Sequence, residues 1–509
     1  MQTMETYIRA GYSAVFVQTK EEDRAVNDIK NIARKRLKSS NMPSGYNCRT
    51  WTVSNGIDYP LKEGEGLDNT QKQREELLRQ ETQDPLKALS VFIEMPDKIP
   101  RYTILIMLDL HLHLRSNNPM LIRMLKEAIR HGRKTNRHII IVGAEAIKHP
   151  ELEKEIQVID LPMPDRAVLV GVIEDMARAA SIEANGETDA ITMALAGLTA
   201  EEAANALAYS LASKKKFDVE LISKLKTESI KRNGILEIVE TNVSMDDIGG
   251  LAGYKQHLRF IAKAFSKEAR DYGLPQPMPL LAVGQPGSGK SLSCMALGAI
   301  LGIPLLRLEA GRLFGSFVGE SEKNWRSAFA TAKAIGKCIC WVDEASALFS
   351  GMASSGKCDG GTTDRVVRAI LQDMQMNSDG IFFAFTANEI DGFPDPLIDR
   401  CDVWSFELPD AEERKAIWDI HIKKRKRNPK DYNIDSFSEA TDGFSGRQIE
   451  QAWTKTMLVA FNAGGREPVD KDVLGVLSRF IPTSVTMKDQ IERRRARLKG
   501  KARQASVLA

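Results

Sequence analysis

The chain of 509 residues carries 71 basic and 68 acidic side chains, which gives a formal net charge of +3. A single hydrophobic core does not organise a chain of this length, so we expect two or more domains. The near balance of charge does not by itself indicate a nucleic-acid-binding protein. No apolar stretch reaches the length that a membrane span requires, so we expect no membrane insertion.

The amino-terminus and the cysteines both indicate a cytoplasmic protein. Residues 1–16, MQTMETYIRAGYSAVF, lack a basic segment followed by an apolar one, so no secretion signal is apparent. The six cysteines show no spacing typical of a metal site, since the nearest pair, Cys338 and Cys340, lies inside an apolar run. We therefore expect reduced thiols in the core.

The first predicted strand lies within residues 11–25, GYSAVFVQTKEEDRA, and acidic residues follow it. No glycine occurs after Gly11 in this stretch, whereas Glu21, Glu22 and Asp23 stand where the strand gives way to a helix. Carboxylates at such a place would repel a triphosphate.

A second apolar run, TILIMLDLHLHL at residues 103–114, meets an aspartate and then two histidines. If the strand continued past Asp109, His111 and His113 would share one face and offer nitrogen ligands to a divalent metal. The alternative is a strand that ends at Asp109, with the histidines where the chain returns to the surface. No nearby cysteine or pair of acids completes a metal shell, which favours the alternative.

The strongest functional signal is LLAVGQPGSGKSL at residues 280–292. An apolar run comes first and an apolar-periodic helix over residues 292–301 follows at once, so the pattern G-x-x-x-x-G-K-S lies between a strand and a helix. Glycines let main-chain N–H groups approach phosphate oxygens, and the helix amino-terminus adds a positive potential. We expect this phosphate loop (residues 284–291) to bind ATP, with Lys290 on the β- and γ-phosphates and Ser291 on Mg²⁺. The residues assigned to nucleotide binding here are Gly284, Gln285, Pro286, Gly287, Ser288, Gly289, Lys290, Ser291 and Leu292.

A further apolar run, KCICWVDEASALF at residues 337–349, ends in two acids. Acids at strand ends are often surface caps, but downstream of a phosphate loop they are typical of a catalytic site. We expect Asp343 to hold Mg²⁺ through water, and Glu344 to align and deprotonate the attacking water.

The order of these motifs resembles the AAA+ ATPases, and within them the AAA clade of ring-forming remodelling enzymes, over about residues 243–480. VSMDDIGGLAGYKQHL at residues 243–258 is similar to the segment that opens the module in this clade. That resemblance implies that Ile248 and Gly249 line the adenine pocket. FAFTANEID resembles the sensor-1 strand, which implies that Asn388 orients the lytic water.

The resemblance also assigns two arginines. Where the clade has two arginines before its next strand, residues 393–404 keep only Arg400, which we expect to act as an arginine finger on the ATP of a neighbouring subunit. The alternative is an ion pair with Asp399 or Asp402. In the lid-like stretch TDGFSGRQIEQAW, Arg447 lies near the place where many AAA+ proteins outside the clade have a sensor-2 arginine. An exposed arginine in the first helical turn is the alternative there.

GSFVGESEKNWRSAF at residues 315–329 is similar to the first pore loop of the clade and the helix after it. Phe317 and Val318 lie in a polar, glycine-flanked loop, and in the resembling family such a pair grips a polypeptide in a central pore. Local packing of the loop is the alternative. Residues 350–363 are rich in glycine and serine and resemble a second pore loop.

The first half of the chain repeats the second half in pattern. AGLTAEEAANAL at residues 196–207 aligns with DGFSGRQIEQAW, and IIIVGAEAI at residues 139–147 aligns with FFAFTANEI. The resulting pairs are Asp109 with Asp343, Leu110 with Glu344, and Glu145 with Asn388. We therefore expect a degenerate AAA-like unit that neither binds nor hydrolyses ATP in the usual way.

This combination of a degenerate first unit with one active second unit resembles the AAA ATPases of the Ycf type in plastids and cyanobacteria. The likeness extends over nearly the whole chain and adds the plastid stroma as an alternative location for an organelle-encoded protein.

Three charged stretches remain. Residues 55–84 are polar and are expected to form a partly helical surface insertion, and the run at residues 423–427 suits the end of a lid helix. Residues 491–504, IERRRARLKGKARQ, are expected to form a frayed basic tail. Such a tail could touch nucleic acid or an anionic membrane, but no interleaved aromatic residues indicate base stacking, so a solvated surface is favoured.

The predicted fold class is α/β, with an AAA+ P-loop NTPase sheet sandwiched by helices, an α-helical lid, and a degenerate AAA-like α/β unit before it. The predicted domains are residues 1–165 (degenerate unit without a phosphate loop), 166–235 (helical lid-like region and linker), 236–410 (large ATPase domain), 411–480 (helical lid) and 481–509 (basic tail). We expect an ATPase that uses ATP and Mg²⁺, assembles into a hexameric ring and remodels or threads a protein partner. The alternatives are a nucleotide-gated scaffold with slow turnover and a nucleic-acid-remodelling ATPase.

Overall fold

The computed structural model describes most of the chain in two compact units. The first unit comprises residues 1–163 with 199–201, and the second comprises residues 164–198 with 202–509. The described residues are 2–35, 37, 45–58, 69–95, 99–116, 118–146, 149–182, 188–232, 234–240, 242–309, 313, 320–347, 362–376, 380–391 and 393–507.

The first unit is built on a six-stranded sheet of order β3-β2-β4-β5-β1-β6, parallel apart from the pairing of β3 with β2. Alternate side chains of its strands enter two separate apolar clusters, as in the neighbours Val15 and Phe16, so both faces of the sheet are covered. The strands are β1 (Ala14–Gln18), β2 (Asn47–Thr52), β3 (Gly56–Ile57), β4 (Thr103–Leu108), β5 (His138–Gly143) and β6 (Gln157–Asp160). The helices are α1 (Gln2–Arg9), α2 (Glu22–Lys35), α3 (Asn69–Glu81), α4 (Pro85–Glu94), α5 (Leu110–Leu114) and α6 (Pro119–Thr135).

Four helices follow, with an apolar cluster of their own that includes Ile173, Leu195 and Leu207. Asp165 caps the first of them by accepting a hydrogen bond from the main-chain N–H of Val168. The helices are α7 (Arg166–Ala179), α8 (Thr188–Leu195), α9 (Ala200–Lys214) and α10 (Val219–Arg232).

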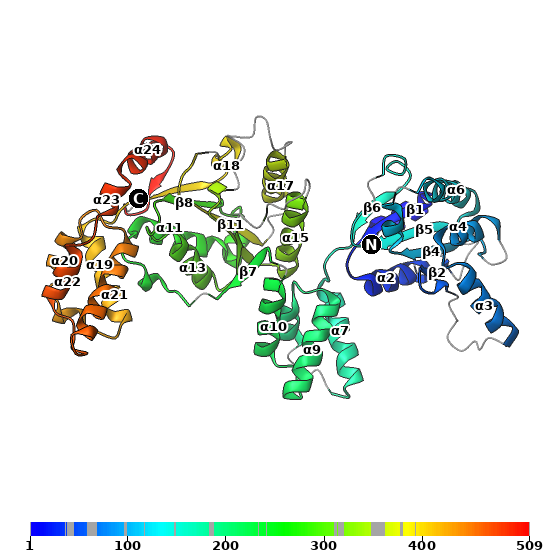
Figure 1. Cartoon of the computed structure of the whole chain (residues 1–509), viewed down its shortest axis with the longest axis horizontal. Coiled ribbons are helices and arrows are strands. Elements are labelled where there is room, and N and C mark those ends of the chain that lie inside the picture. Colours follow the sequence, from blue (N-terminus) through cyan, green and yellow to red (C-terminus); the bar gives the residue numbers. More distant parts are fainter. Residues whose placement is uncertain are drawn as a thin grey trace. The chain divides into compact units, whose positions relative to one another are not determined.

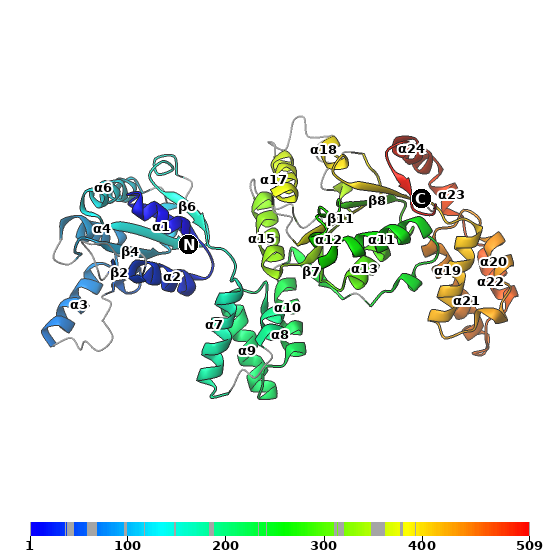
Figure 2. The same cartoon turned by 180° about the vertical axis from the view of Figure 1, so that it is seen from behind.

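The second unit contains a seven-stranded sheet of order β13-β12-β8-β11-β10-β9-β7, parallel apart from β7 (Figure 1). The strands are β7 (Leu236–Val239), β8 (Leu280–Gly284), β9 (Leu305–Glu309), β10 (Cys338–Asp343), β11 (Ile381–Ala387), β12 (Asp402–Phe406) and β13 (Arg503–Gln504). Helices α11 (Ala252–Ala264), α13 (Lys290–Leu301), α15 (Glu320–Ile335) and α17 (Thr362–Met376) lie against it, and short helices η1 (Met245–Asp247), α12 (Lys267–Asp271) and α18 (Asp395–Ile398) connect the main elements (Figure 2).

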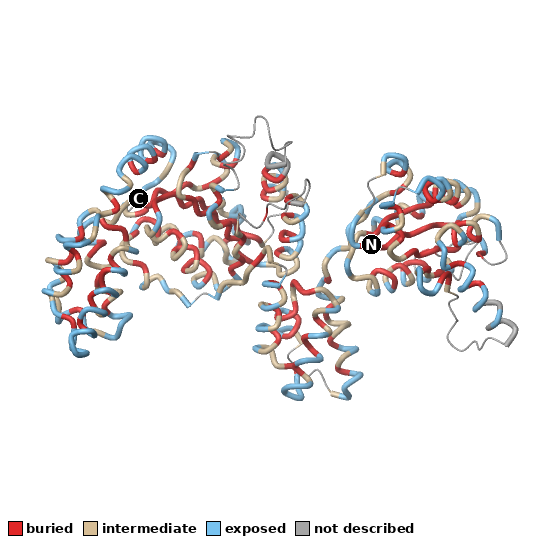
Figure 3. The backbone as a smooth tube through the Cα atoms, viewed as in Figure 1, coloured by how far each residue is buried: buried red, intermediate tan, exposed pale blue. Residues whose placement is uncertain are grey.

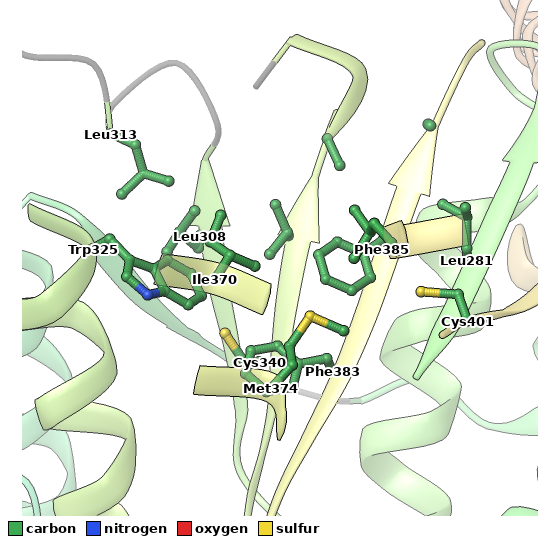
Figure 4. Close-up of a cluster of buried hydrophobic side chains, with 14 of the residues drawn as sticks. Leu281, Leu308, Leu313, Trp325, Cys340, Ile370, Met374, Phe383, Phe385 and Cys401 are labelled. Carbon is green, nitrogen blue, oxygen red and sulfur yellow. The ribbon is translucent and has the colours of Figure 1, made fainter. Parts of the chain in front are cut away.

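Helices cover both faces of this sheet, which places its central strands in the interior (Figure 3). On one face, Trp325 of α15 stacks near Phe383 of β11, and Ile370 of α17 completes the cluster (Figure 4). On the other face, Tyr254 of α11 packs in the cluster that contains Trp341. Each face buries large aromatic side chains among its aliphatic ones, and this burial stabilises the packing of the helices on the sheet.

The carboxyl-terminal helices form a lid around Trp418, Phe437 and Trp453. A capping box at Ser445, whose side chain accepts from the N–H of Gln448, begins its longest helix. The lid contains α19 (Ala411–Lys424), η2 (Pro429–Asp431), α20 (Ile434–Ala440), α21 (Gly446–Asn462) and α22 (Asp470–Leu477), and α23 (Thr483–Thr486) and α24 (Lys488–Leu498) follow it. These elements confirm the predicted α/β class with parallel sheets flanked by helices.

The two sheets share a topology, as the internal repeat implies. The order β2-β4-β5-β1-β6 in the first unit matches β9-β10-β11-β8-β12 in the second, strand for strand. Gly197 and Gly443, which the sequence repeat aligns, both have positive φ angles, +93° and +73°. Both glycines precede a lid-type helix, and glycine enters this backbone region without a Cβ penalty.

The register of the strands places Asp109 and Asp343 at corresponding positions. Leu108 pairs with Val142 across β4 and β5, and the residue before Asp343 pairs with Phe385 across β10 and β11. The first unit departs from the second directly afterwards, because Asp109 itself adopts a positive φ angle and α5 begins at the next residue.

His111 and His113 therefore lie in the helix α5 and not on an extended strand. His111 is buried edge-on against Phe16, and His113 lies near Trp51. Within the described ranges, no three His, Cys, Asp or Glu side chains gather where they could hold a metal ion. Both imidazoles pack against aromatic rings, and Nδ1 of His111 lies 3.7 Å from Oδ1 of Asp109.

The basic carboxyl-terminal segment is folded, so the prediction of a frayed tail is wrong. Ile491, Arg494 and Leu498 of α24 are buried, and β13 then pairs with β12 at the edge of the sheet. The main-chain O of Ala505 accepts a hydrogen bond from the N–H of Tyr254. The apolar positions recur at helical spacing within the run of charges, and a count of charges alone conceals them.

Five cysteines lie in the described part of the chain, and all five are buried free thiols, as expected. Burial raises the pKa of these thiols, for example to about 12 for Cys340, which favours the protonated form. Cys358 lies outside the described residues. Among the described helices, none is long and apolar enough to cross a membrane.

The position of Leu498 in the core of the second unit can be tested directly. Leu498→Ala should destabilise this unit by about 2–5 kcal/mol, because the deletion leaves a cavity beneath the sheet. Tryptophan fluorescence during urea unfolding is a suitable measurement, since five of the six tryptophans belong to residues 325–453. Lys499→Ala, at the exposed neighbouring position, is the control. Equal unfolding midpoints for the two variants would contradict the folded segment.

Candidate nucleotide site

The phosphate loop connects β8 to α13 in the second unit, as the sequence predicts. Gly287 and Gly289 have φ angles of +81° and +98°, which side-chain-bearing residues rarely adopt. Gly284 lies so close to the main-chain O of Phe406 that a Cβ would collide with it. The loop thus requires glycine at these places for its conformation and for its packing against β12.

Lys290 begins α13 and its ammonium group is buried inside the loop. Its Nζ donates to the main-chain O of Gly284 at 2.7 Å, to the main-chain O of Gln285 at 2.9 Å and to Oδ1 of Asn388 at 3.1 Å. Burial, followed by the nearby Arg494 guanidinium, lowers the pKa of Lys290 to about 8. An anionic ligand at this place would favour the charged form of the lysine.

Asp343 ends β10 next to this ammonium group, and neighbouring strands fix its carboxylate. Arg307 of β9 donates from Nη2 to Oδ2 at 2.8 Å, and the hydroxyl of Thr386 donates to Oδ1 at 2.6 Å. Glu344 follows with an exposed side chain and a φ angle of +52°. A non-glycine residue in this backbone region is strained, and such strain is typical of functional sites.

Asn388 follows the last residue of β11, so its amide reaches Lys290 from the adjacent strand. The lysine, the aspartate and the asparagine therefore meet at the carboxyl edge of three neighbouring strands. That edge is where open parallel sheets bind ligands.

The lid closes over the phosphate loop at the start of α21. The main-chain N–H of Arg447 donates to the O of Gly287 at 3.3 Å, and a Cβ built on Gly287 would lie 2.6 Å from the Cβ of Arg447. Arg447, for which the sequence predicts a nucleotide contact, thus lies beside the phosphate loop.

A second contact joins the lid to the segment before α11. Gly249 lies against Ile417 of α19, where a Cβ would be 2.5 Å from Cγ1 of the isoleucine. Oε1 of Glu413 accepts from the N–H of Leu251 at 2.7 Å, and Ile248 is buried. The two residues predicted to line an adenine pocket therefore lie at the junction of lid and sheet domain.

Arg400 lies between α18 and β12, and its Nη1 donates to the main-chain O of Pro396 at 2.7 Å. Asp402, one of its predicted alternative partners, pairs instead with His257 at 2.8 Å and with Arg503 at 3.6 Å. The predicted pore residues Phe317 and Val318, and the stretch 350–361, lie outside the described residues.

Two functional candidates were not predicted from the sequence. Arg307 fixes Asp343 from β9, and Arg494 of α24 reaches Gln285 and the main chain of Asn388. The spacing of Ile491, Arg494 and Leu498 is a helical apolar stripe with an arginine in it, and this pattern is the signal for a buried arginine.

The side chains present fit a nucleoside triphosphate with a divalent cation. Nε2 of Gln285 and Oγ of Ser288 are buried in the loop and have no hydrogen-bond partner among the described residues. Two unpaired polar groups beside a helix amino-terminus and an ammonium group suit phosphate oxygens. Ser291, in the first turn of α13, and Asp343 supply the oxygen ligands that Mg²⁺ prefers.

The corresponding place in the first unit has the opposite charge. Three residues, Thr19 to Glu21, separate β1 from α2, and Glu22 and Asp23 occupy the first helical turn. Burial first, and then the nearby Asp109, raise the pKa of Glu22. This acidic helix start disfavours a phosphate group.

Three family models match successive parts of the chain. The model described as "SpoVK-like AAA ATPase, N-terminal domain" matches residues 1–161, and "SpoVK-like AAA ATPase, second domain" matches residues 166–233. The model described as "ATPase family associated with various cellular activities (AAA)" matches residues 280–406, which contain the phosphate loop, Asp343 and Asn388.

Relatives match over nearly the whole chain. The AAA domain-containing protein ycf46 of Guillardia theta is 31% identical over 494 residues, which are 95% of this chain and 92% of that protein. The ycf46 protein of Pyropia yezoensis is 30% identical over 515 residues, 99% of each chain. A proteasome-activating nucleotidase of Saccharolobus islandicus is 26% identical over 268 residues, which are 51% of this chain and 68% of that protein.

The close approach of loop and lid predicts that Gly287→Ala weakens binding of a fluorescent ADP analogue about tenfold, which corresponds to about 1.4 kcal/mol. The added methyl group would collide with Arg447 as well as strain the backbone. Gly302→Ala is the matched control, because Gly302 ends the same helix with a φ angle of +61° but has nothing within 4 Å of the added atom. Equal affinities of the two variants would contradict the predicted collision between loop and lid.

Proposed function

This chain belongs to the ycf46 family of AAA domain-containing proteins, and on that premise we propose that its second unit binds ATP with Mg²⁺ and hydrolyses it. The observation that carries the proposal is the meeting of Lys290, Asp343 and Asn388 at one edge of the sheet. A chance glycine-rich turn would not bring these three groups together.

Each side chain has a role in this reaction. The ammonium of Lys290 and the N–H groups of the loop bind the phosphates. Ser291 and Asp343 would hold the metal ion, whose charge would offset that of the phosphates. Glu344 takes a proton from a water molecule that Asn388 orients. The water oxygen forms a bond to the γ-phosphorus while the bond to the ADP oxygen breaks. The fixed dipoles of the loop N–H groups require little reorganisation.

Arg400 completes the proposed site from a neighbouring subunit. Within its own chain, Nη1 of Arg400 donates to the main-chain O of Pro396, and its Nε and Nη2 donate to the side-chain amide oxygen of Gln375. The guanidinium has five N–H groups, so two donors remain beyond these three bonds. We propose that these donors stabilise transition-state charge on the ATP of the adjacent copy in a hexameric ring. Activity then depends on self-association.

The proposed work of the ring is to thread or remodel a protein partner, with Phe317 and Val318 as the gripping pair. The similarity to a proteasome-activating nucleotidase over 268 residues supports this class of function. Remodelling of nucleic acid has less support, because several of the carboxyl-terminal arginines are paired with acids of the same chain. Arg495 pairs with Glu407, and Arg497 pairs with Asp391.

Glu344→Gln should abolish steady-state ATP hydrolysis, with a loss of at least about 100-fold, while binding of ATP persists. The amide keeps the shape of the side chain but cannot accept a proton. Phosphate release and binding of a fluorescent ATP analogue are measured in parallel over a range of protein concentrations. The specific activity of the parent chain should rise with concentration as subunits associate.

Glu309→Gln, at the end of β9, is the control for loss of a nearby carboxylate. Gel filtration with ATP reports assembly of the trapped Glu344→Gln form. A parent chain that remains monomeric and hydrolyses ATP at its full rate would contradict the role of Arg400 in trans.

Phe317→Ala distinguishes threading from a nucleotide-gated scaffold. A threading enzyme should lose most of its processing of a bound protein and keep its basal ATPase within about twofold, since in this proposal the aromatic ring acts on the protein substrate and has no part in hydrolysis. The partner is obtained by trapping Glu344→Gln with ATP in cells and identifying the protein that remains bound. If Phe317→Ala processes that partner as the parent does, the scaffold function is the better description.

A further inference from the structure

The carboxyl-terminal helix α24 delivers a fully buried arginine to the nucleotide site. Arg494 is 1% exposed, although both of its sequence neighbours, Arg493 and Arg495, are exposed. Its Nη1 donates to the main-chain O of Asn388 at 2.7 Å, and its Nη2 donates to Oε1 of Gln285 at 2.9 Å. One guanidinium therefore bridges the phosphate loop and the residue after β11.

The two cations of the site bind the same two residues through complementary atoms. Lys290 binds the main-chain O of Gln285 and the side-chain O of Asn388. Arg494 binds the side-chain O of Gln285 and the main-chain O of Asn388. Four hydrogen bonds thus hold the loop and the asparagine at one mutual distance.

Burial of a guanidinium is unfavourable unless acceptors satisfy it. The carboxylate of Glu389, at 3.9 Å from Nη1, adds an opposite charge to the two carbonyl acceptors. The planar fork of arginine spans two acceptors at fixed spacing, which a single ammonium group does not reproduce. The side chain is therefore held rigidly between two segments that belong to the nucleotide site.

Attachment of the segment to the fold does not require this arginine. Leu498 and Ile491 already bury α24, β13 pairs with β12, and Ala505 accepts from Tyr254. An apolar side chain at position 494 would serve attachment without the cost of a buried charge. Both acceptors of Arg494 belong to residues of the nucleotide site, which indicates a role for the arginine in that site.

We propose that Arg494 is a positioning residue for ATP hydrolysis, which keeps Asn388 and the phosphate loop in register when a triphosphate draws the ammonium of Lys290 away from them. This inference rests on the proposed function. ATP phosphates compete with Gln285 and Asn388 for the ammonium of Lys290. Arg494 binds other oxygen atoms of these two residues, so its hydrogen bonds do not depend on that ammonium. The carboxyl-terminal segment, which returns from the lid to the sheet, thereby acts on the geometry of the water-orienting residue.

The test compares Arg494→Gln, Arg494→Lys and the exposed control Arg493→Gln in the full chain. Initial rates with MgATP give kcat and KM, a fluorescent ADP analogue titrates competent sites, and thermal unfolding reports folding. Arg494→Gln should lower kcat per competent site between about 10- and 100-fold, because small displacements of positioned groups have effects of this size. KM should change less than about threefold, since the main-chain phosphate contacts remain.

Arg494→Lys should fall between the parent and Arg494→Gln, and Arg493→Gln should match the parent. A lower unfolding temperature with unchanged kcat per competent site in Arg494→Gln would overturn the inference and leave a purely structural arginine. If Arg494→Gln does not fold, Arg494→Lys decides, and a kcat within twofold of the parent overturns the inference.

The failure of this inference is separable from failure of the proposed function. A parent chain without MgATP hydrolysis that depends on Glu344 would overturn the proposed function, and the inference with it. A parent chain with that activity, and an Arg494→Gln variant of equal kcat, would overturn the inference alone.

Discussion

The buried ammonium group of Lys290 imposes a constraint that much of the second unit satisfies. A charge removed from water needs acceptors on several sides, and three different segments supply them. The loop offers the carbonyl groups of Gly284 and Gln285, and β11 offers the side chain of Asn388. Asp343 contributes an opposite charge nearby, which Arg307 and Thr386 hold in place. The strand order that brings β10 and β11 beside β8 is thus also the arrangement that makes the site possible.

Features that depend on short stretches of sequence were predictable. The phosphate loop is read from its glycines and from the change of apolar period between β8 and α13, and the helix start at Ser445 follows from its capping residues. The repeat was also recognisable from the sequence, because the corresponding strands of the two sheets follow each other at similar intervals along the chain. The correspondence of Asp109 to Asp343 in the repeat follows from these intervals. The positive φ angle of Asp109, in contrast, was not predicted from the sequence.

Features that depend on long-range contacts were not predictable. The Arg494 guanidinium is far in sequence from both Gln285 and Asn388, and no local rule joins α24 to the loop. The high charge of residues 491–504 predicts a solvated tail. The three buried positions, Ile491, Arg494 and Leu498, are few among these charges and give only a weak helical pattern. Arg307 was missed for the same reason, since only the pairing of β9 with β10 places it beside Asp343.

The first unit shows that the sheet does not require the phosphate site. Its strands keep the order of the second unit and bury both faces, yet acids occupy the helix start after β1. Apolar alternation is sufficient for the sheet, whereas phosphate binding adds demands on glycine, lysine and charge that this unit does not meet. A unit of this kind retains its packing surfaces and its topology without the chemistry.

We expect nucleotide to bind at the phosphate loop of the second unit and not in the first unit. Isothermal titration of the full chain with MgATP, in the Glu344→Gln background that prevents turnover, measures the number of sites. One site per chain is expected, and the further change Lys290→Ala should remove it. Two sites per chain, or one site that survives Lys290→Ala, would contradict this expectation.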